Sequence, residues 1–241
     1  MPKFRLLQAR HADDPVREEE RAAFATQLDV PVYSIVPHDL LTAPNELGVV
    51  TDGVDAVLVG GSGKFSVLDE APWLSSFFDT LGALADAQFP TFASCFGFQG
   101  MVLALGGTVE HDEPNAEVGT YTLFTTEQAS QDPVFGGLPA RFDAQLGHKD
   151  RAVIFPDSAV LLAHSKRCPY QAMRVGEQVY ATQFHPELSY LGNRLRFERY
   201  LDDYSQVFGS ERAARMLEEF TPSPHADTLL LSFKEAFWKK S

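Results

Sequence analysis

The stretch PTFASCFGFQGMVLALGG, residues Pro90–Gly107, places a cysteine between two apolar segments. PTFAS is short and apolar and predicts a buried strand, and the part from Phe96 onward predicts a helix that ends at Gly106 and Gly107. Cys95 therefore stands where a strand turns directly into a helix. Buried strands followed at once by helices are the units from which parallel sheets are built.

The same alternation of apolar strands and helices fills the chain before this stretch. Three further strands and two helices are predicted, and the charged REEER run (Arg17–Arg21) is interpreted as the exposed face of the first helix. The strands are Phe4–Ala9, Val32–Val36 and Asp55–Gly61, and the helices are Val16–Leu28 and Ala71–Ala87.

The pattern changes after Gly107, where strands follow one another with few helices between them. The strands predicted there are Val118–Thr126, Ala140–Gly147, Ala159–Ser165, Gln171–Gly176 and Gln178–Phe184, and three helices follow over Leu191–Phe208, Ser210–Phe220 and Asp227–Lys240. We therefore expect an α/β fold with an open, mostly parallel sheet flanked by helices. The predicted division is a domain over residues 1–204 and a helical C-terminal extension over residues 205–241.

Composition and charge exclude several classes of function. The 241 residues are 44% apolar and 22% charged, as in a globular protein, and the formal net charge of −13 argues against nucleic-acid binding because phosphates carry the same sign. No apolar run is long enough to span a membrane, and no signal peptide is recognisable. With two cysteines and no CxxC motif, neither a disulfide framework nor a metal site is expected, and the expected location is cytoplasmic.

Cys95 has two interpretations. As a nucleophile it would sit on a sharp strand-to-helix turn, with small residues two before and two after it, here Ala93 and Gly97. The helix N-terminus would then favour negative charge on the sulfur, and the backbone N–H of Phe96 would face an oxyanion. As a structural residue it would be a small buried hydrophobe. This stretch alone leaves both interpretations open.

A second segment favours the nucleophile. QVYATQFHPEL (Gln178–Leu188) ends a predicted strand with His185 and carries Glu187 two residues later. A cysteine nucleophile needs a base, and the base needs an acceptor that orients it. His185 alone would be interpreted as an ordinary loop histidine, but together with Cys95 it predicts a triad of Cys95, His185 and Glu187.

A third segment supplies glycines at the end of another buried strand. In VLVGGSG (Val57–Gly63), Gly60 and Gly61 would let the backbone approach a ligand closely, and the alternative is a plain glycine-rich turn. A phosphate-binding loop is not indicated, since neither GxGxxG nor GxxxxGK[ST] occurs. The backbone N–H of Gly61 is the predicted second donor to an oxyanion.

Taken together and in this order, these segments resemble the class I (triad) glutamine amidotransferase family, in register from about Phe4 to about Tyr204. The nearest branches are the stand-alone, GMP-synthase-like amidotransferases and the γ-glutamyl peptidases. Ala93 departs from the family pattern, which has glycine there, so the turn would be one methyl group tighter. The matching motifs are ASCFGFQ with Cys95, Gly97 and Gln99, HPE with His185 and Glu187, GGS from Gly60 to Ser62, and GHKD from Gly147 to Asp150.

The resemblance implies the flavodoxin-like fold of these amidotransferases and roles for further residues. Gly61 and Phe96 would form the oxyanion hole. The resemblance implies a substrate-binding role for four further residues, Gly60, Gln99, His148 and Asp150. His148 and Asp150 could equally form a polar turn between strands.

The resemblance also implies the reaction. Cys95 would attack the side-chain amide of glutamine, a γ-glutamyl thioester would form, and the ammonia would pass to a separate synthase partner, with no cofactor or metal. A stand-alone γ-glutamyl peptidase and a non-catalytic regulatory module on the same fold remain alternatives.

The last predicted helix carries an apolar stripe of Leu229, Leu230, Phe233 and Phe237. We expect this stripe either to pack on the domain or to form a homodimer surface.

Overall fold

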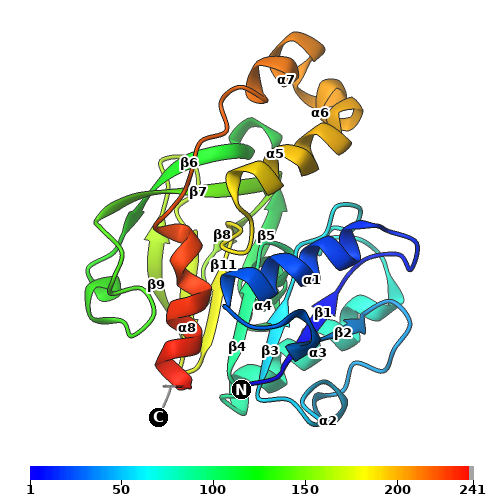
Figure 1. The fold of residues 1–241 in the computed structure, drawn as a ribbon, viewed down its shortest axis with the longest axis vertical. Helices are drawn as coiled ribbons and strands as arrows, with labels where there is room; N and C mark the ends of the chain where they lie inside the picture. Colours follow the sequence, from blue (N-terminus) through cyan, green and yellow to red (C-terminus); the bar gives the residue numbers. More distant parts are fainter. Residues whose placement is uncertain (239–241) are drawn as a thin grey trace.

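The computed structural model describes residues 1–238 and shows a large twisted sheet with helices on both faces (Figure 1). Its nine strands run in the order β2-β1-β3-β4-β11-β10-β9-β6-β7; the first five are parallel and the last four pair antiparallel. The bounds are β1 Phe4–Gln8, β2 Ile35–Asp39, β3 Ala56–Val59, β4 Thr91–Ser94, β6 Glu117–Thr125, β7 Arg141–His148, β9 Ala159–His164, β10 Ala172–Val175 and β11 Val179–Thr182.

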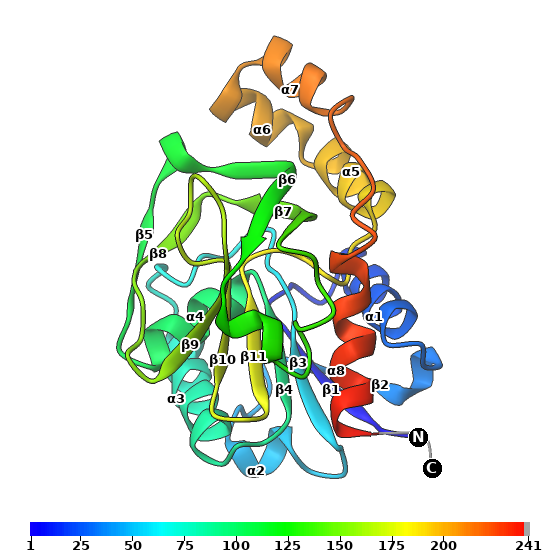
Figure 2. The same cartoon turned by 90° about the vertical axis from the view of Figure 1, so that its left-hand side faces the viewer.

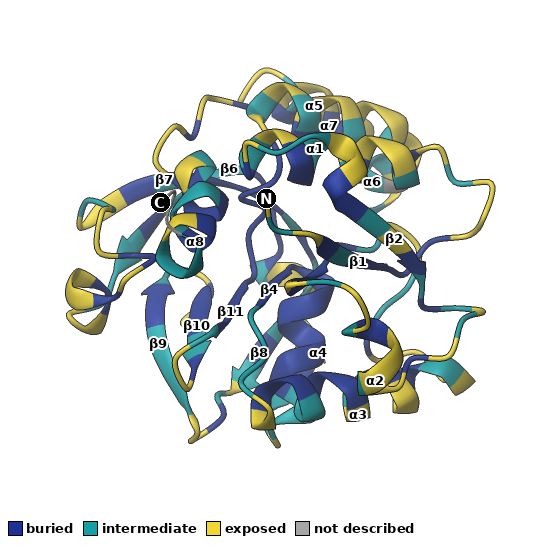
Figure 3. Cartoon of the chain, turned by 60° about the horizontal axis from the view of Figure 1, so that its bottom comes forward, coloured by how far each residue is buried: buried dark blue, intermediate teal, exposed yellow. Residues whose placement is uncertain are grey.

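Successive side chains along each strand point to opposite faces of the sheet and pack into two separate cores, one on each face. Phe4, Leu58 and Phe92 pack with α1 and α8 on one face, whereas Val57 and Ala93 pack with α3 and α4 on the other. Figure 3 shows α4 as almost wholly buried. The bounds are α1 Val16–Gln27, α2 Leu47–Val50, α3 Pro72–Asp86, α4 Phe96–Ala104 and α8 Leu229–Phe237.

The centre of the sheet explains where a site can form. Every residue of β3, β4 and β11 is buried, and these strands are adjacent and parallel. Their carboxyl ends therefore meet at one edge, which is where ligands bind in open α/β sheets. The predicted fold class, an open and mostly parallel sheet flanked by helices, is confirmed.

Two details differ from the sequence-based expectation. A second, two-stranded sheet of β5 (Thr108–His111) and β8 (Asp150–Ile154) was not predicted. The expected helix Leu191–Phe208 is divided at Tyr200 into α5 (Tyr190–Arg199) and α6 (Leu201–Phe208).

The C-terminal helices fall into two groups. α5, α6 and α7 (Ser210–Met216) project beyond the end of the sheet around their own small apolar cluster, as Figures 1 and 2 show. α8 instead returns to the main core, where Leu229, Leu230 and Phe233 are fully buried, so this part of the apolar stripe packs on the domain. Residues 239 and 240 of the expected last helix lie outside the described residues. The division at residue 204 stays a prediction.

None of the helices in residues 1–238 has the length and apolar character required to cross a bilayer. No group of three or more histidine, cysteine, aspartate or glutamate side chains in this part of the chain is arranged to hold a metal ion.

Candidate active site

Cys95 lies on a strained turn between β4 and α4. Its φ of 50° and ψ of −97° belong to a region that residues with a side chain seldom occupy, and strain of this kind concentrates at functional sites. Close packing surrounds the turn, because a Cβ placed on Gly97 would lie 2.8 Å from Val59 and 3.0 Å from the Cβ of Ala93. The absence of a side chain at Gly97 is therefore what accommodates the methyl group of Ala93.

His185 and Glu187 follow β11, the neighbour of β4. Nδ1 of His185 lies 2.7 Å from Oε1 of Glu187, and both side chains are buried. A tight turn, in which Leu188 N–H donates to the His185 carbonyl, folds the glutamate back onto the histidine. The structure thus brings the two residues of the HPE motif into hydrogen-bond contact.

The electrostatics of this pair favour a charged histidine. Burial alone would lower the pKa of His185, but the Glu187 carboxylate and the Cys95 sulfur outweigh burial and raise it well above its ordinary value. Burial would likewise raise the pKa of Glu187, and the His185 charge outweighs that effect and lowers it. The Glu187 carboxylate and the Cys95 sulfur therefore both favour the imidazolium form of His185.

The two predicted oxyanion donors border the same space. A Cβ on Gly61 would lie 2.8 Å from Cε1 of His185 and 3.8 Å from the Cβ of Cys95, so the Gly61 backbone sits directly beside both. Phe96 is the first residue of α4, where backbone N–H groups precede the helical hydrogen-bond ladder. The structure thus brings both Gly61 and Phe96 next to Cys95.

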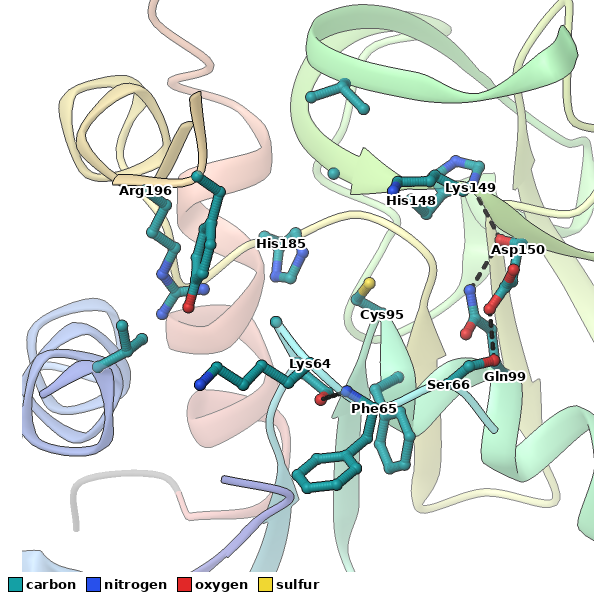
Figure 4. A pocket seen from close by; sticks show the side chains of 18 of the residues that line it. Lys64, Phe65, Ser66, Cys95, Gln99, His148, Lys149, Asp150, His185 and Arg196 are labelled. Atoms are coloured by element: carbon teal, nitrogen blue, oxygen red, sulfur yellow. Dashed lines mark hydrogen bonds between the residues drawn. The ribbon is translucent and has the colours of Figure 1, made fainter. Parts of the chain in front are cut away.

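The four residues predicted to bind substrate lie in two places. Gln99, His148 and Asp150 lie together on one side of Cys95 (Figure 4), and all three line the cavity. The carbonyl oxygen of Asp150 accepts hydrogen bonds from Gln99 at 2.8 Å and from Nδ1 of His148 at 3.0 Å. Gly60 is not among the residues that line the cavity and instead packs against the Glu20 carboxylate.

The Asp150 carboxylate ties the turn between β7 and β8 to two other segments. It lies 2.7 Å from Nδ1 of His111 on β5 and accepts a 2.6 Å hydrogen bond from Ser66, in the loop after β3. This loop borders the cavity on the side opposite His148 (Figure 4). Asp150 therefore holds one wall of the cavity in place.

A buried ion pair supports the Gly60–Gly61 strand end, and sequence reasoning missed it. Glu20 is fully buried, in contrast to the expectation that REEER is an exposed face, and Arg10 donates to it at 3.0 and 3.2 Å. Arg10 also donates to the Gly61 carbonyl at 3.2 Å, and a Cβ on Gly60 would lie within 2.7 Å of the Glu20 carboxylate. Val16, Glu20 and Phe24 are spaced by four, which could have revealed the buried position.

Cationic side chains gather on the His185 side of the cavity. Arg196 of α5 lies 3.9 Å from Glu20, and its charge also helps to lower the pKa of Glu187. Lys64, from the loop after β3, reaches toward the same side in Figure 4. The cavity has a volume of about 460 Å³, and Cys95, Lys64 and Arg196 are among the residues that line it.

The second cysteine has a different environment. Cys168 is fully buried outside this cavity, and burial raises the pKa of its thiol to about 11. A thiol of that kind is a structural residue.

An open α/β sheet with a strained cysteine and an acid-paired histidine at its carboxyl edge has the layout of a nucleophile-elbow enzyme. The comparison with protein families defines the class further, since the model of the family "Glutamine amidotransferase class-I" matches residues 32–196. The chain belongs to the class I glutamine amidotransferase family.

Relatives agree with this assignment. One subunit of the glutamine-hydrolyzing GMP synthase of Methanothermobacter thermautotrophicus is 30% identical over 165 residues, covering 67% of this chain and 86% of the relative. The glutamine-hydrolyzing GMP synthase of Thermosipho africanus is 31% identical over 56% of this chain, and the match covers 25% of that relative's length. The chain thus spans about a quarter of the length of the first curated relatives it matches.

The fold has solved counterparts. A glutamine amidotransferase from Thermotoga maritima superposes with a TM-score of 0.72 at 17% identity, over 99% of both chains. A second, from Methylobacillus flagellatus, gives 0.66 at 16% identity and covers 100% of this chain and 96% of the other. At such identities the likeness establishes the fold.

Proposed function

We propose that this protein hydrolyses the side-chain amide of glutamine through a covalent intermediate on Cys95. One observation carries the proposal: a strained cysteine, a glutamate-bound histidine and the backbone of Gly61 converge on one cavity. A binding module has no need of this combination.

The steps follow from the positions of the groups. The Cys95 sulfur attacks the amide carbon, and the resulting oxyanion is held by the N–H groups of Gly61 and Phe96. His185, oriented by Glu187, gives its proton to the leaving nitrogen as the C–N bond breaks, and ammonia departs. His185, now neutral, takes a proton from a water molecule as that water attacks the thioester carbon. The C–S bond then breaks, which releases glutamate and restores the Cys95 thiolate and the His185 imidazolium.

The direct test uses the purified protein with glutamine. We expect release of glutamate and ammonia in equal amounts, and covalent labelling of Cys95 by a glutamine-like alkylating analogue at neutral pH. A protein that neither releases ammonia nor takes up the label, alone or with cell extract, would instead be a non-catalytic module on this fold.

A separate synthase is the proposed receiver of the ammonia. The relative from Methanothermobacter thermautotrophicus is named as one subunit of a GMP synthase, and it matches this chain over 86% of its own length. We therefore infer that this protein works as the glutaminase beside a partner that consumes ammonia. Co-purification of such a partner from the native host, with glutaminase activity rising when it is added, tests this inference.

A γ-glutamyl amino acid is a second candidate substrate, favoured by the charge around His185. The leaving amine lies on the His185 side because this histidine protonates it, and Lys64 and Arg196 lie there too (Figure 4). A leaving group that bears a carboxylate would meet these cations, whereas ammonia has nothing for them to recognise.

Replacing Lys64 by alanine separates the two substrates. We expect KM for γ-glutamylglycine to rise about fivefold, because an exposed charge pair contributes up to about 1 kcal/mol, and KM for glutamine to stay unchanged. Steady-state assays on both substrates measure this. Lys149, on the other side of the cavity, is the matched control, and its alanine variant should leave the ratio of the two KM values unaltered.

Replacing Glu187 by glutamine should make activity fall at a lower pH on the alkaline side of the optimum. The Glu187 charge raises the pKa of His185, so removing that charge lowers it, and the imidazolium is lost at a lower pH. We expect the alkaline limb of kcat/KM to move down by more than about one pH unit, with a loss of roughly 10²-fold to 10⁴-fold at the optimum. An alkaline limb that stays in place would show that Glu187 does not set the charge of His185.

A further inference from the structure

The side chain of Gln183 points at the sulfur of Cys95. Gln183 follows β11 and is fully buried, and its Nε2 lies 3.8 Å from Sγ. Its backbone N–H donates to the carbonyl of Gln171, which fixes the segment between β11 and His185. The amide thus reaches the sulfur by a path distinct from that of His185.

The orientation of this amide follows from its neighbours. Gln99 Nε2 lies 2.8 Å from the Asp150 carbonyl oxygen, and a carbonyl oxygen can only accept, so the Gln99 nitrogen must face it. The same nitrogen lies 3.2 Å from Oε1 of Gln183. Because that partner is a donor, Gln183 must turn its oxygen toward Gln99 and its N–H toward Cys95.

The far end of this chain of hydrogen bonds is anchored in the core. Nδ1 of His148 also donates to the Asp150 carbonyl, and its Nε2 lies 3.2 Å from the buried Glu117 carboxylate. Glu117 in turn accepts from Ser165 at 2.7 Å and from Gln171 at 2.6 Å. The carbonyl that orients Gln99 is therefore held by a buried network.

We propose that Gln183 is a further catalytic residue, whose amide N–H donates a hydrogen bond to the Cys95 thiolate and is aimed there by Gln99. The inference rests on the proposed role of Cys95 as the nucleophile. A donor directed at a group favours its charged form, and a buried donor keeps that preference without competition from water. Gln183 would thus hold the sulfur as a thiolate before substrate arrives.

Other charged groups face the same cavity and stay constant in the experiment. They are Arg10 after β1, Lys64 and Asp69 after β3, His111 on β5, His185 after β11, Arg196 on α5, and His148, Lys149 and Asp150 around the turn between β7 and β8. A change seen on replacing Gln183 alone is therefore assigned to its amide.

The test measures alkylation of Cys95 by iodoacetamide as a function of pH, with the modified peptide quantified by mass spectrometry. We expect the pH of half-maximal rate to rise by about one unit in Gln183→Leu, because the thiolate loses a buried donor. In Gln183→Glu, which keeps the volume but can place a carboxylate beside the sulfur, the rise should be larger. Gln99→Met should give a smaller rise, because the Gln183 amide then loses the group that orients it.

Gln145→Leu is the matched control. Gln145 is another fully buried amide, and its side-chain hydrogen bonds join it to Thr120, Asn193, the Thr221 carbonyl and Ser223 rather than to the sulfur. Its variant should lose stability yet keep the alkylation profile of the wild type. If the pH profile of alkylation moves equally in Gln183→Leu and Gln145→Leu, the effect comes from loss of packing in the core, and the inference is wrong.

The remaining outcomes separate the inference from the function on which it rests. If wild-type Cys95 is alkylated but both Gln183 variants, folded by circular dichroism, overlay its profile, the inference is wrong and the proposed nucleophile stands. If wild-type Cys95 resists alkylation from about pH 5 to about pH 10, the range over which thiols become thiolates, the proposed function itself fails.

Discussion

Replacing Cys95 by serine is expected to lower kcat for glutamine hydrolysis by at least about 10⁴-fold. A serine hydroxyl attacks only when a base removes its proton. The Glu187 carboxylate, which the variant keeps, raises the pKa of His185 and favours its protonated form, so His185 is a poor base for a hydroxyl. A thiol ionises far more readily and depends less on such a base. Steady-state release of ammonia by the purified variant measures the loss.

The fold should survive this change. Cys95 is buried and the substitution replaces sulfur by oxygen at the same backbone position, so circular dichroism and the urea midpoint should stay close to those of the wild type. Cys168→Ser is the matched control, since it removes the other buried thiol away from the cavity and should retain hydrolysis. Full activity in Cys95→Ser would mean that another group is the nucleophile.

The parts of the fold that the sequence predicts are those with strong local patterns. The strands that end before Gly60, Cys95 and Gln183 are short and mostly apolar, and such runs indicate buried central strands without tertiary information. The order of motifs then places the candidate triad at one sheet edge. The ribbon of β5 and β8 has no comparable pattern, because each of its strands is short and partly exposed.

The residues that support the candidate site cannot be predicted from the sequence, and the reason is different. Glu20 lies in a run of charges, and only the approach of Arg10 after β1 and of Gly60 after β3 makes its position a buried one. Gln183 falls inside the predicted strand Gln178–Phe184, and its role depends on the side chain of Gln99, 84 positions away. Pairings between distant segments of the chain cannot be derived from local periodicity.

Replacing Glu20 by glutamine is expected to lower the free energy of unfolding by about 3–5 kcal/mol, a large part of the roughly 5–15 kcal/mol typical of a folded domain. The carboxylate is fully buried and accepts hydrogen bonds from Gln8 at 2.9 Å and from Arg10 at 3.0 and 3.2 Å. Without its charge, the buried guanidinium of Arg10 loses its main partner. Urea denaturation with an unchanged m value measures the loss.

The adjacent residue supplies a control on the same helix. Glu19 pairs with Arg199 at 2.8 Å, but both side chains are largely exposed, so Glu19→Gln should cost less than about 1 kcal/mol. The same formal change at neighbouring positions thus separates burial from charge. Equal losses in the two variants would contradict the importance of burial.

Adding Arg10→Met to Glu20→Gln should recover part of the stability, since removing both members of a buried pair leaves no uncompensated charge. Activity should not recover with it. Arg10 is the group that holds the Gly61 carbonyl, and a loosened Gly61 misplaces the N–H that faces the oxyanion, a donor whose loss costs about 10²-fold to 10³-fold in kcat. A double variant that regains stability while remaining slow would show that the buried pair serves the oxyanion hole as well as the fold.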